Sequence, residues 1–476
     1  MFWTGIVAGG LALTGFAQAD SGNGPYINGD FDQVTPQGHP AYWYAEADPA
    51  AATILVDRSG ADPALLLGAA GDTPAVLYTP LSLGARCVAS ISASAALLSR
   101  DDGLTVSLFF LEPGQAPGMG DAGAGQGRIS VSQNAGGDCL PPNLLVGLLA
   151  SGEGQARVDD IRIVADGEAY ATAPPPRMQA RASDIAWIDR NALSVSTLEP
   201  DAPLDDLAPL RDALGAAGIV GLGENSHGAR ALFRLKHRLL RLLVEDEGFT
   251  ALAVEMPAAG ADTVNAYIHG ESDDDRAALL ALGYPSWQSA EMWAVIEWLR
   301  SHNAHAETRV RVYGLDLADR GGLSVDASMA AEAGRIAGEH ESGIVIWADN
   351  THVTRAEGAM GHALAQTFGA EYIAVGLTFG SGHYSAYGPE QRYAAHPAYP
   401  GTHEAVLDRA AVPAFFLDIT DLPGGHVLGG TLGFRYLGSR PQELTQFYPH
   451  RLAEHFDLIG YVEETDSTQY LFEHDF

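Results

Sequence analysis

In the first third of the chain, short stretches of alternating apolar and polar residues predominate. Apolar and polar side chains alternate over residues 87–92, 104–109 and 156–163, and segments rich in glycine, proline and aspartate separate these stretches. Alternation with a period of two places one face of a strand on a core and the other face in water. Several such strands predict an all-β, jelly-roll-like sandwich domain over residues 20–167.

The pattern changes after residue 183, where apolar runs of four or five residues alternate with longer helix-like stretches. The runs cover residues 218–222, 250–254, 310–314, 343–347, 372–376 and 414–417, and the helix-like stretches include 229–247, 289–302 and 356–368. Strands that are buried on both faces and separated by helices are typical of a largely parallel sheet. We therefore predict an α/β domain with flanking helices over residues 183–476.

Two segments lie outside these domains. Residues 168–182 contain three consecutive prolines, which favour an extended linker. Residues 1–19 form an apolar run that ends in Ala17-Gln18-Ala19, a pattern typical of signal-peptide cleavage. We expect a secreted or periplasmic protein, and no later segment predicts a membrane span.

The composition narrows the choice of partners. The formal net charge is −33, which argues against nucleic acid and against anionic membrane surfaces, because both are bound by patches of lysine and arginine. Cys87 and Cys139 are the two cysteines, and they could pair in an oxidising compartment. Lys236 is the single lysine of the chain.

Acidic and imidazole side chains follow five of the predicted strands of the second domain. In chain order these side chains are Glu224 and His227, then Glu255, then Asp316, then Asp349 and His352, and finally His383. Ligands of open α/β sheets bind outside the carboxyl ends of the strands. We therefore predict an active site at this edge of the sheet.

Residues 221–228 read GLGENSHG, and the glycines permit a tight turn from a strand into a helix. The segment lacks the GK[ST] ending of a phosphate-binding loop. Gly223 lies three residues before Ser226, whereas a nucleophile elbow requires two. We therefore expect Ser226 to cap the helix rather than to act as a nucleophile.

A carboxylate three residues before an imidazole, as in Glu224 and His227, suits general-base catalysis, because the acid can orient the ring. Together with Glu255 and His352, the same pair would also offer two oxygen and two nitrogen ligands to a metal ion. The spacing leaves both possibilities open.

Several segments of the second domain resemble the erythromycin esterase family in collinear order. They are residues 221–257, 265–270, 287, 291, 298–300, 303, 313–316, 347–353, 360–361, 435 and 456–461. The resemblance implies a hydrolase that cleaves an ester or lactone, with macrolides among the candidate substrates, and that needs no metal or other cofactor.

The resemblance also implies roles for individual residues. His227 would activate water as a general base, oriented by Glu224 or Glu255, while Lys236 and His352 would stabilise the oxyanion or protonate the leaving alcohol. The residues expected to bind the substrate are Arg230, Asp316, Asp349, His383 and Arg435.

Two features depart from the family pattern. Asp349 stands where the pattern H-N-x-H has its first histidine, and a short connection joins Asp316 to Trp347 in place of a long helical insertion. The short connection predicts a more open site. A metal-dependent hydrolase is one alternative, and Asp349 favours a second, a catalytically decayed binding protein.

The sandwich domain carries a weaker resemblance. Residues 28–31, Trp43 and residues 158–161 resemble the two ends of galactose-binding-like jelly rolls. The resemblance implies glycan as a further candidate partner.

Overall fold

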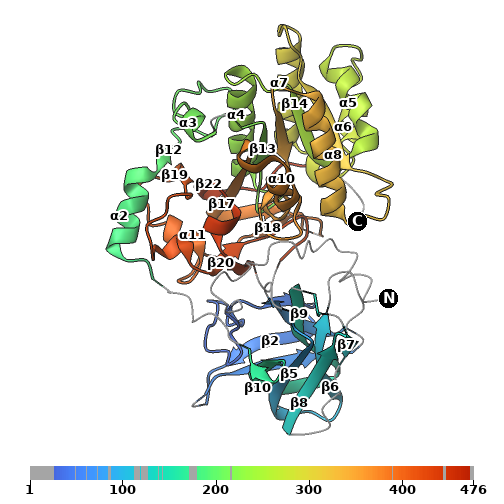
Figure 1. Ribbon diagram of the computed structural model, residues 1–476, viewed down its shortest axis with the longest axis vertical. Helices are drawn as coiled ribbons and strands as arrows, with labels where there is room; N and C mark the ends of the chain where they lie inside the picture. Colours follow the sequence, from blue (N-terminus) through green and yellow to red (C-terminus); the bar gives the residue numbers. More distant parts are fainter. Residues whose placement is uncertain are drawn as a thin grey trace. The chain divides into compact units, whose positions relative to one another are not determined.

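The chain folds as two compact units in the computed structural model (Figure 1). The structure describes residues 26–471 except 49, 61, 72, 84–86, 112–117, 120–126, 138, 142, 171–178, 215–216, 389 and 443–445. The expected signal peptide and most of the expected linker lie outside the described residues. The first unit comprises residues 1–178, 431–434 and 442–450, and the second comprises residues 179–430, 435–441 and 451–476.

The first unit contains two antiparallel sheets, which confirms the predicted β-sandwich. One sheet has the order β1 (Tyr44–Glu46), β4 (Ala75–Ser82), β9 (Asn143–Gly152), β6 (Leu104–Leu111) and β7 (Gly118–Met119). The other has the order β2 (Ala52–Asp57), β3 (Ala64–Ala69), β10 (Gly154–Ala165), β5 (Ser90–Arg100) and β8 (Gly127–Asn134), and β11 (Glu168–Ala169) pairs with β10. The first two residues of the expected linker therefore belong to the sandwich.

Apolar side chains from both sheets form the core of the sandwich. Leu77 and Leu148 come from one sheet, Leu65 and Val158 come from the other, and all four are fully buried. The two sequence segments that resemble the ends of a jelly roll also meet, because the backbone N–H of Ile161 donates to the carbonyl of Gly29 at 2.9 Å.

A mixed sheet forms the centre of the second unit. Its main path runs β12 (Leu193–Ser194), β19 (Ala414–Asp418), β22 (Leu458–Thr465), β17 (Tyr372–Ser385), β13 (Ile219–Leu222), β16 (Ile344–Trp347), β14 (Ala251–Pro257) and β15 (Arg311–Asp316), and β18 (Arg392–Ala394) pairs with β17. Neighbours from β22 to β15 are parallel, whereas β19 is antiparallel to β22. The prediction of a largely parallel sheet is confirmed, and its sixth run is the antiparallel exception.

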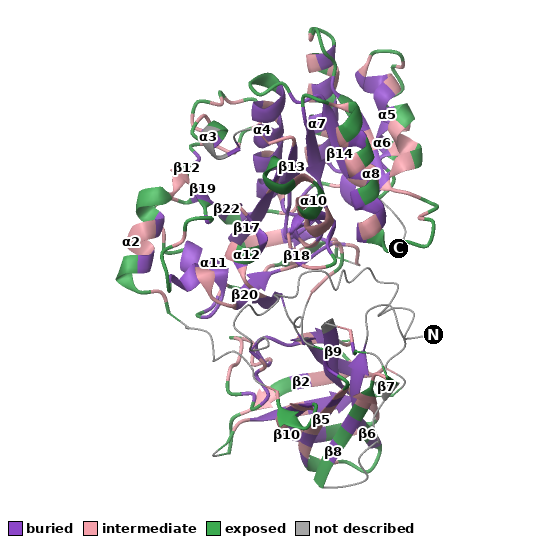
Figure 2. Cartoon of the chain, viewed as in Figure 1, coloured by how far each residue is buried: buried purple, intermediate pink, exposed green. Residues whose placement is uncertain are grey.

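Helices cover the sheet in the expected alternation. They are α2 (Ala182–Asn191), α3 (Leu210–Leu214), α4 (Arg230–Glu245), α5 (Ala261–Ile268), α6 (Asp275–Ala281), α7 (Ala290–Asn303), α8 (Val325–Glu339), α9 (Asn350–Val353), α10 (Met360–Phe368), α11 (His403–Leu407) and α12 (Leu452–His455). A two-stranded sheet of β20 (Leu432–Arg435) and β21 (Phe447–His450) belongs, except for Arg435, to the first unit. The central strands β13 and β16 are buried, while helices such as α2 and α8 carry exposed residues (Figure 2). Among the described residues, no helix has the length and apolar character needed to cross a membrane.

The order of the strands determines where the polar residues meet. β16 lies between β13 and β14 although it follows both in the chain. Because these three neighbours run parallel, the segments that leave their carboxyl ends lie at one edge of the sheet. The candidate residues after these strands are therefore brought together, whereas those of β15 and β17 flank them.

A disulfide joins Cys87 and Cys139 in the first unit, with 5.0 Å between their Cα atoms and 52 residues of separation. Closing a loop of this length restricts the unfolded chain. We expect the double substitution Cys87→Ser, Cys139→Ser to lower the free energy of unfolding of the sandwich by about 2–4 kcal/mol. Denaturant unfolding followed by fluorescence tests this, and equal stability of the two proteins would contradict it.

Candidate active site

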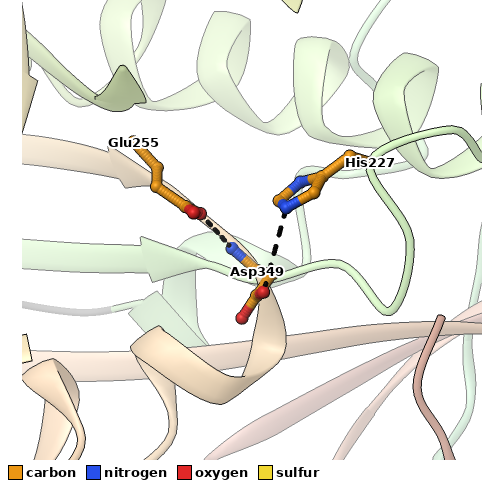
Figure 3. A group of neighbouring side chains, drawn as sticks. All are labelled: His227, Glu255 and Asp349. Carbon is orange, nitrogen blue, oxygen red and sulfur yellow. Dashed lines mark hydrogen bonds and ion pairs between the residues drawn. The ribbon is translucent and has the colours of Figure 1, made fainter. Parts of the chain in front are cut away.

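Three polar side chains converge at the ends of β13, β14 and β16 (Figure 3). His227 follows β13, Glu255 lies near the end of β14, and Asp349 follows β16. The Nε2 atom of His227 lies 3.9 Å from Oδ2 of Asp349, and the backbone N–H of Asp349 donates to Oε2 of Glu255 at 3.2 Å. Three segments that are distant in sequence thus form one cluster.

Glu224 connects the imidazole to the lysine. Its Oε1 lies 3.0 Å from Nδ1 of His227, while its Oε2 accepts a hydrogen bond from Nζ of Lys236. Glu224 and Lys236 are both completely buried. Nζ of Lys236 also donates to the carbonyl of Ala348 at 3.1 Å and lies 4.4 Å from the ring centroid of Trp347.

This placement assigns Lys236 a role different from the expected one. The ammonium group lies behind Glu224, where it neutralises a buried carboxylate, instead of facing a reacting ester. A buried carboxylate without a counterion would be strongly unfavourable. Lys236 therefore holds the carboxylate of Glu224 in place beside His227.

A second carboxylate–imidazole pair lies on the other side of the cluster. Oδ1 of Asp326 lies 2.9 Å from Nδ1 of His352, and it also accepts the backbone N–H of Met360 at 2.9 Å. Nε2 of His352 faces Oε1 of Glu255 at 3.4 Å. Both histidines are thus held at Nδ1 by a carboxylate.

Asp326 is a member of the site that could not be predicted from the sequence. In sequence it is an acidic residue in the first turn of α8, two positions after the N-cap Ser324. Acidic side chains are common there because they interact favourably with the helix dipole. No local signal separates a residue of this kind from one that reaches His352.

Asp349 has a structural role as well as a place in the cluster. It is the N-cap of α9, where its Oδ1 accepts the backbone N–H groups of Thr351 at 2.7 Å and His352 at 3.2 Å. Aspartate is among the favoured N-cap residues. Its other oxygen, Oδ2, is directed at His227.

The electrostatics of the cluster favour charged side chains. Burial alone would lower the pKa of His227, but the hydrogen bond to Glu224 and the charges of Glu255 and Asp349 raise this pKa to about 9. Burial likewise opposes protonation of His352, yet the neighbouring carboxylates, Asp349 foremost, raise its pKa well above the usual value. Both rings are therefore in the positively charged imidazolium form at neutral pH while no substrate is bound.

The pKa values of Glu255 and Lys236 are lowered, in contrast to those of the two histidines. Burial would raise the pKa of Glu255, but the charges of His352 and His227 lower it to about 2. Burial lowers the pKa of Lys236 to about 8, although Glu224 opposes this change. Glu255 is therefore a permanent anion at neutral pH.

Aromatic rings form an apolar wall beside the cluster. The ring of Trp287 lies edge-on to His227 with 5.0 Å between centroids, and its Nε1 donates to the backbone carbonyl of Glu255 at 2.6 Å. Phe233 packs against both Trp287 and Trp347. This wall excludes water from one side of the site and strengthens the electrostatic interactions within it.

The loop between β13 and α4 is fixed by a neighbouring segment. The backbone N–H of Leu437 donates to the carbonyl of Asn225 at 2.7 Å, and the N–H of His227 donates to the carbonyl of Gly438 at 3.2 Å. Oγ of Ser226 accepts the N–H of Gly228 at 3.1 Å, but the N-cap of α4 is Ala229. The expectation that Ser226 caps the helix is therefore wrong, since its hydroxyl accepts a hydrogen bond within the turn that precedes the N-cap.

Arg435 and His383 lie apart from the cluster. The guanidinium of Arg435 is fully buried and donates to backbone carbonyls that include Gly380 at 2.8 Å and His396 at 3.0 Å. Its place in the interior does not suit the expected contact with a substrate. His383 lies within β17 instead of after it, because β17 continues to Ser385 through its pairing with β18 and β22.

Arg230 and Asp316 flank the site. Nε of Arg230 forms an ion pair with Glu291 at 2.8 Å, and Asp316 forms an ion pair with Arg320 at 2.8 Å. Arg230 also lines an open depression of about 370 Å³, and the other residues around this depression are Ser385, Glu390, Gln391, Arg392 and residues 467–470. His227, Glu255 and Asp349 do not line this depression.

The second unit is similar to known proteins over most of its length. The family model for erythromycin esterase matches residues 244–327 and 319–465, which lie almost entirely in the second unit. Erythromycin esterase type II of Escherichia coli is 36% identical over 138 residues, which are 29% of this chain and 32% of that protein. The chain thus spans about a third of the length of this curated relative.

Two solved structures share the fold. One is a succinoglycan biosynthesis protein, 20% identical with a TM-score of 0.52, covering 60% of this chain and 98% of that chain. The other is a protein from Bacillus cereus, 18% identical with a TM-score of 0.53, covering 61% of this chain and 99% of that chain.

The carboxylate of Asp326 should govern the protonation of His352. In the variant Asp326→Asn, we expect the pKa of His352 to fall, because a charge that stabilises the imidazolium is lost while the side chain keeps its shape. Titration of the imidazole by NMR measures this directly. An unchanged pKa, in a variant with wild-type stability, would show that Asp326 does not control this ring.

Proposed function

We propose that the second unit hydrolyses a carboxylic ester or lactone by general-base activation of water. The Glu224–His227 pair is the observation that carries the proposal, since a carboxylate at 3.0 Å fixes the ring and leaves Nε2 directed toward Glu255 and Asp349. The match to the family model for erythromycin esterase supports hydrolysis of an ester as the reaction class.

The reaction follows from this geometry in two steps. The neutral Nε2 of His227 removes a proton from water, and the oxygen of that water bonds to the ester carbonyl to give a tetrahedral oxyanion. When the oxyanion collapses, the bond to the alcohol oxygen breaks and the alcohol takes up a proton. The products are a carboxylic acid and an alcohol, or a hydroxy acid from a lactone.

The neighbouring groups divide the remaining tasks. Glu224 stabilises the imidazolium that forms on His227, and Lys236 keeps Glu224 in place. His352 carries its proton beside Glu255 and is the group best placed to stabilise the oxyanion or protonate the alcohol. Asp349 replaces an imidazole of the family pattern and adds a negative charge beside the base.

We further propose that the protein is exported. The apolar run that ends at Ala19 and the disulfide between Cys87 and Cys139 both support an oxidising compartment. The preferred substrate is an ester or lactone. The short connection after Asp316, which lacks the helical insertion of the family pattern, argues against a molecule as large as a macrolide. Glycan binding by the sandwich stays a prediction from sequence.

Two other candidate functions make different predictions. A metal-dependent hydrolase would lose its activity to a chelator and regain it with metal. A catalytically decayed binding protein would turn over none of the esters tested, yet bind the same ligand with His227 replaced. The first alternative is favoured by the ligand atoms of His227, Glu255 and Asp349, which lie within 4.8 Å of one another.

Loss of the imidazole should remove most of the activity. We expect His227→Ala to lower kcat/KM for a panel of esters, lactones and macrolides by about 10²–10⁴-fold, which is the usual contribution of a general base. The panel is measured with and without EDTA. The exposed His305 supplies the matched control, His305→Ala, which should behave as wild type. Wild-type turnover by His227→Ala would contradict the proposal.

The rate should also depend on pH in a defined direction. His227 must be neutral to act as a base and its pKa is raised to about 9, so kcat/KM should rise as the pH increases from 7 to 9. In Glu224→Gln the carboxylate that raises this pKa is absent, so the rise should move to lower pH. A profile whose midpoint is the same in both proteins would exclude His227 as the titrating base.

A further inference from the structure

Nitrogen and oxygen atoms of three side chains surround one point at the ends of β13, β14 and β16. One ligand atom each from His227, Glu255 and Asp349 lies within 4.8 Å of the others (Figure 3). One imidazole nitrogen with two carboxylate oxygens is a ligand set that zinc and related divalent metals accept. Three protein ligands with an open fourth position are typical of sites that also bind water.

Among the described residues, Nε2 of His227 and Oδ2 of Asp349 make no other hydrogen bond, whereas the oxygens of Glu255 already contact the N–H of Asp349 and the ring of His352. Oδ1 of Asp349 is occupied by the N-terminus of α9, whereas Oδ2 has Nε2 of His227 at 3.9 Å as its neighbour in the described part of the chain. A separation of 3.9 Å is too long for a hydrogen bond. The two groups are therefore directed at each other across a space that a bridging atom fits.

The surroundings of His227 suit a metal ligand. Its Nδ1 lies 3.0 Å from Glu224, and a hydrogen bond there holds the proton on Nδ1 and leaves the lone pair of Nε2 directed at the shared point. Histidines that bind metals usually donate their second N–H to a carboxylate or carbonyl in this way. Glu224 itself is not available as a ligand, since its second oxygen binds Lys236.

The charge of the cluster also favours a cation. The carboxylates of Glu224, Glu255, Asp326 and Asp349 lie around the point, and they outnumber the neighbouring cationic groups, which are Lys236, His227 and His352. A metal ion on Nε2 of His227 takes the place of the proton that this nitrogen otherwise carries. Bonds of about 2.0–2.2 Å to a zinc-like ion require the ligands to approach slightly. Glu255 can supply this movement because its side chain is long and 19% exposed.

We propose that the second unit binds one divalent transition-metal cation of the zinc class through Nε2 of His227 and the carboxylates of Glu255 and Asp349. The cation competes with the proposed hydrolysis, because the same lone pair of Nε2 cannot bind a metal and accept a proton from water. The competition rests on the proposed function, whereas the binding itself does not. Asp349, the residue that departs from the family pattern, is the ligand that completes the site.

Calorimetric titration of the EDTA-treated, dialysed full-length protein with zinc chloride tests the site. The wild type should bind one zinc ion per chain, and Asp349→Asn should bind it at least about tenfold more weakly. Asparagine is also a good N-cap, so this variant keeps the start of α9. The control Asp262→Asn removes an exposed carboxylate elsewhere and should bind as wild type does.

The outcomes separate the two claims. No binding at about 1 mM zinc, or equal binding by Asp349→Asn and wild type, would overturn the site. If ester hydrolysis in the same samples falls on zinc addition in wild type but not in Asp349→Asn, both the site and the competition are supported. Turnover that requires zinc would keep the site and overturn the metal-free mechanism. Zinc binding with unchanged turnover would overturn His227 as a ligand.

Discussion

The buried carboxylate of Glu224 is the interaction on which the site depends. A carboxylate without exposure to water is unfavourable unless both of its oxygens have charged or hydrogen-bonded partners. Lys236 and His227 supply those partners on opposite sides. The single lysine of the chain is thus tied to the single carboxylate that orients the candidate base. Because Lys236 also donates to the carbonyl of Ala348, these contacts join the loop between β13 and α4 to helix α4 and to the segment before α9.

The sheet supplies the second constraint. Because β16 inserts between β13 and β14, Glu255 and Asp349, which are 94 positions apart, meet within hydrogen-bonding distance. Each strand contributes one or two polar groups, and the backbone of Asp349 connects two of these contributions by donating to Glu255. The site therefore depends on the order of the strands in the sheet. An alternative order with β16 at an edge would separate the two carboxylate–imidazole pairs.

Much of this could be predicted from the sequence. Period-two alternation and short apolar runs identified the sandwich and the largely parallel sheet, and the position of acids after the strands identified Glu224, His227, Glu255, Asp349 and His352. These signals are local, because a run of apolar residues and the polar residue that follows it can both be recognised within a few positions of the sequence. The strand order is not local, and so the exact neighbours of each residue could not be predicted.

The errors have the same origin. Lys236 reads as a basic residue near the site, but only the tertiary structure shows that it lies behind Glu224. His383 follows an apolar run, yet pairing with β18 extends β17 beyond it. Asp326 looks like a helix-start acid until α8 is placed beside His352. Arg435 carries a charge that the fold uses to bind backbone carbonyls in the interior.

The central claim is that Glu224 sets the protonation state of His227 and leaves its Nε2 available for chemistry. Nitrogen NMR of the imidazole across a pH titration tests this most directly, because it reports both the pKa and the protonated nitrogen. The account predicts a pKa near 9, with the proton retained on Nδ1 above that pH. A pKa near the ordinary value of about 6.5, or a neutral ring protonated on Nε2, would contradict it.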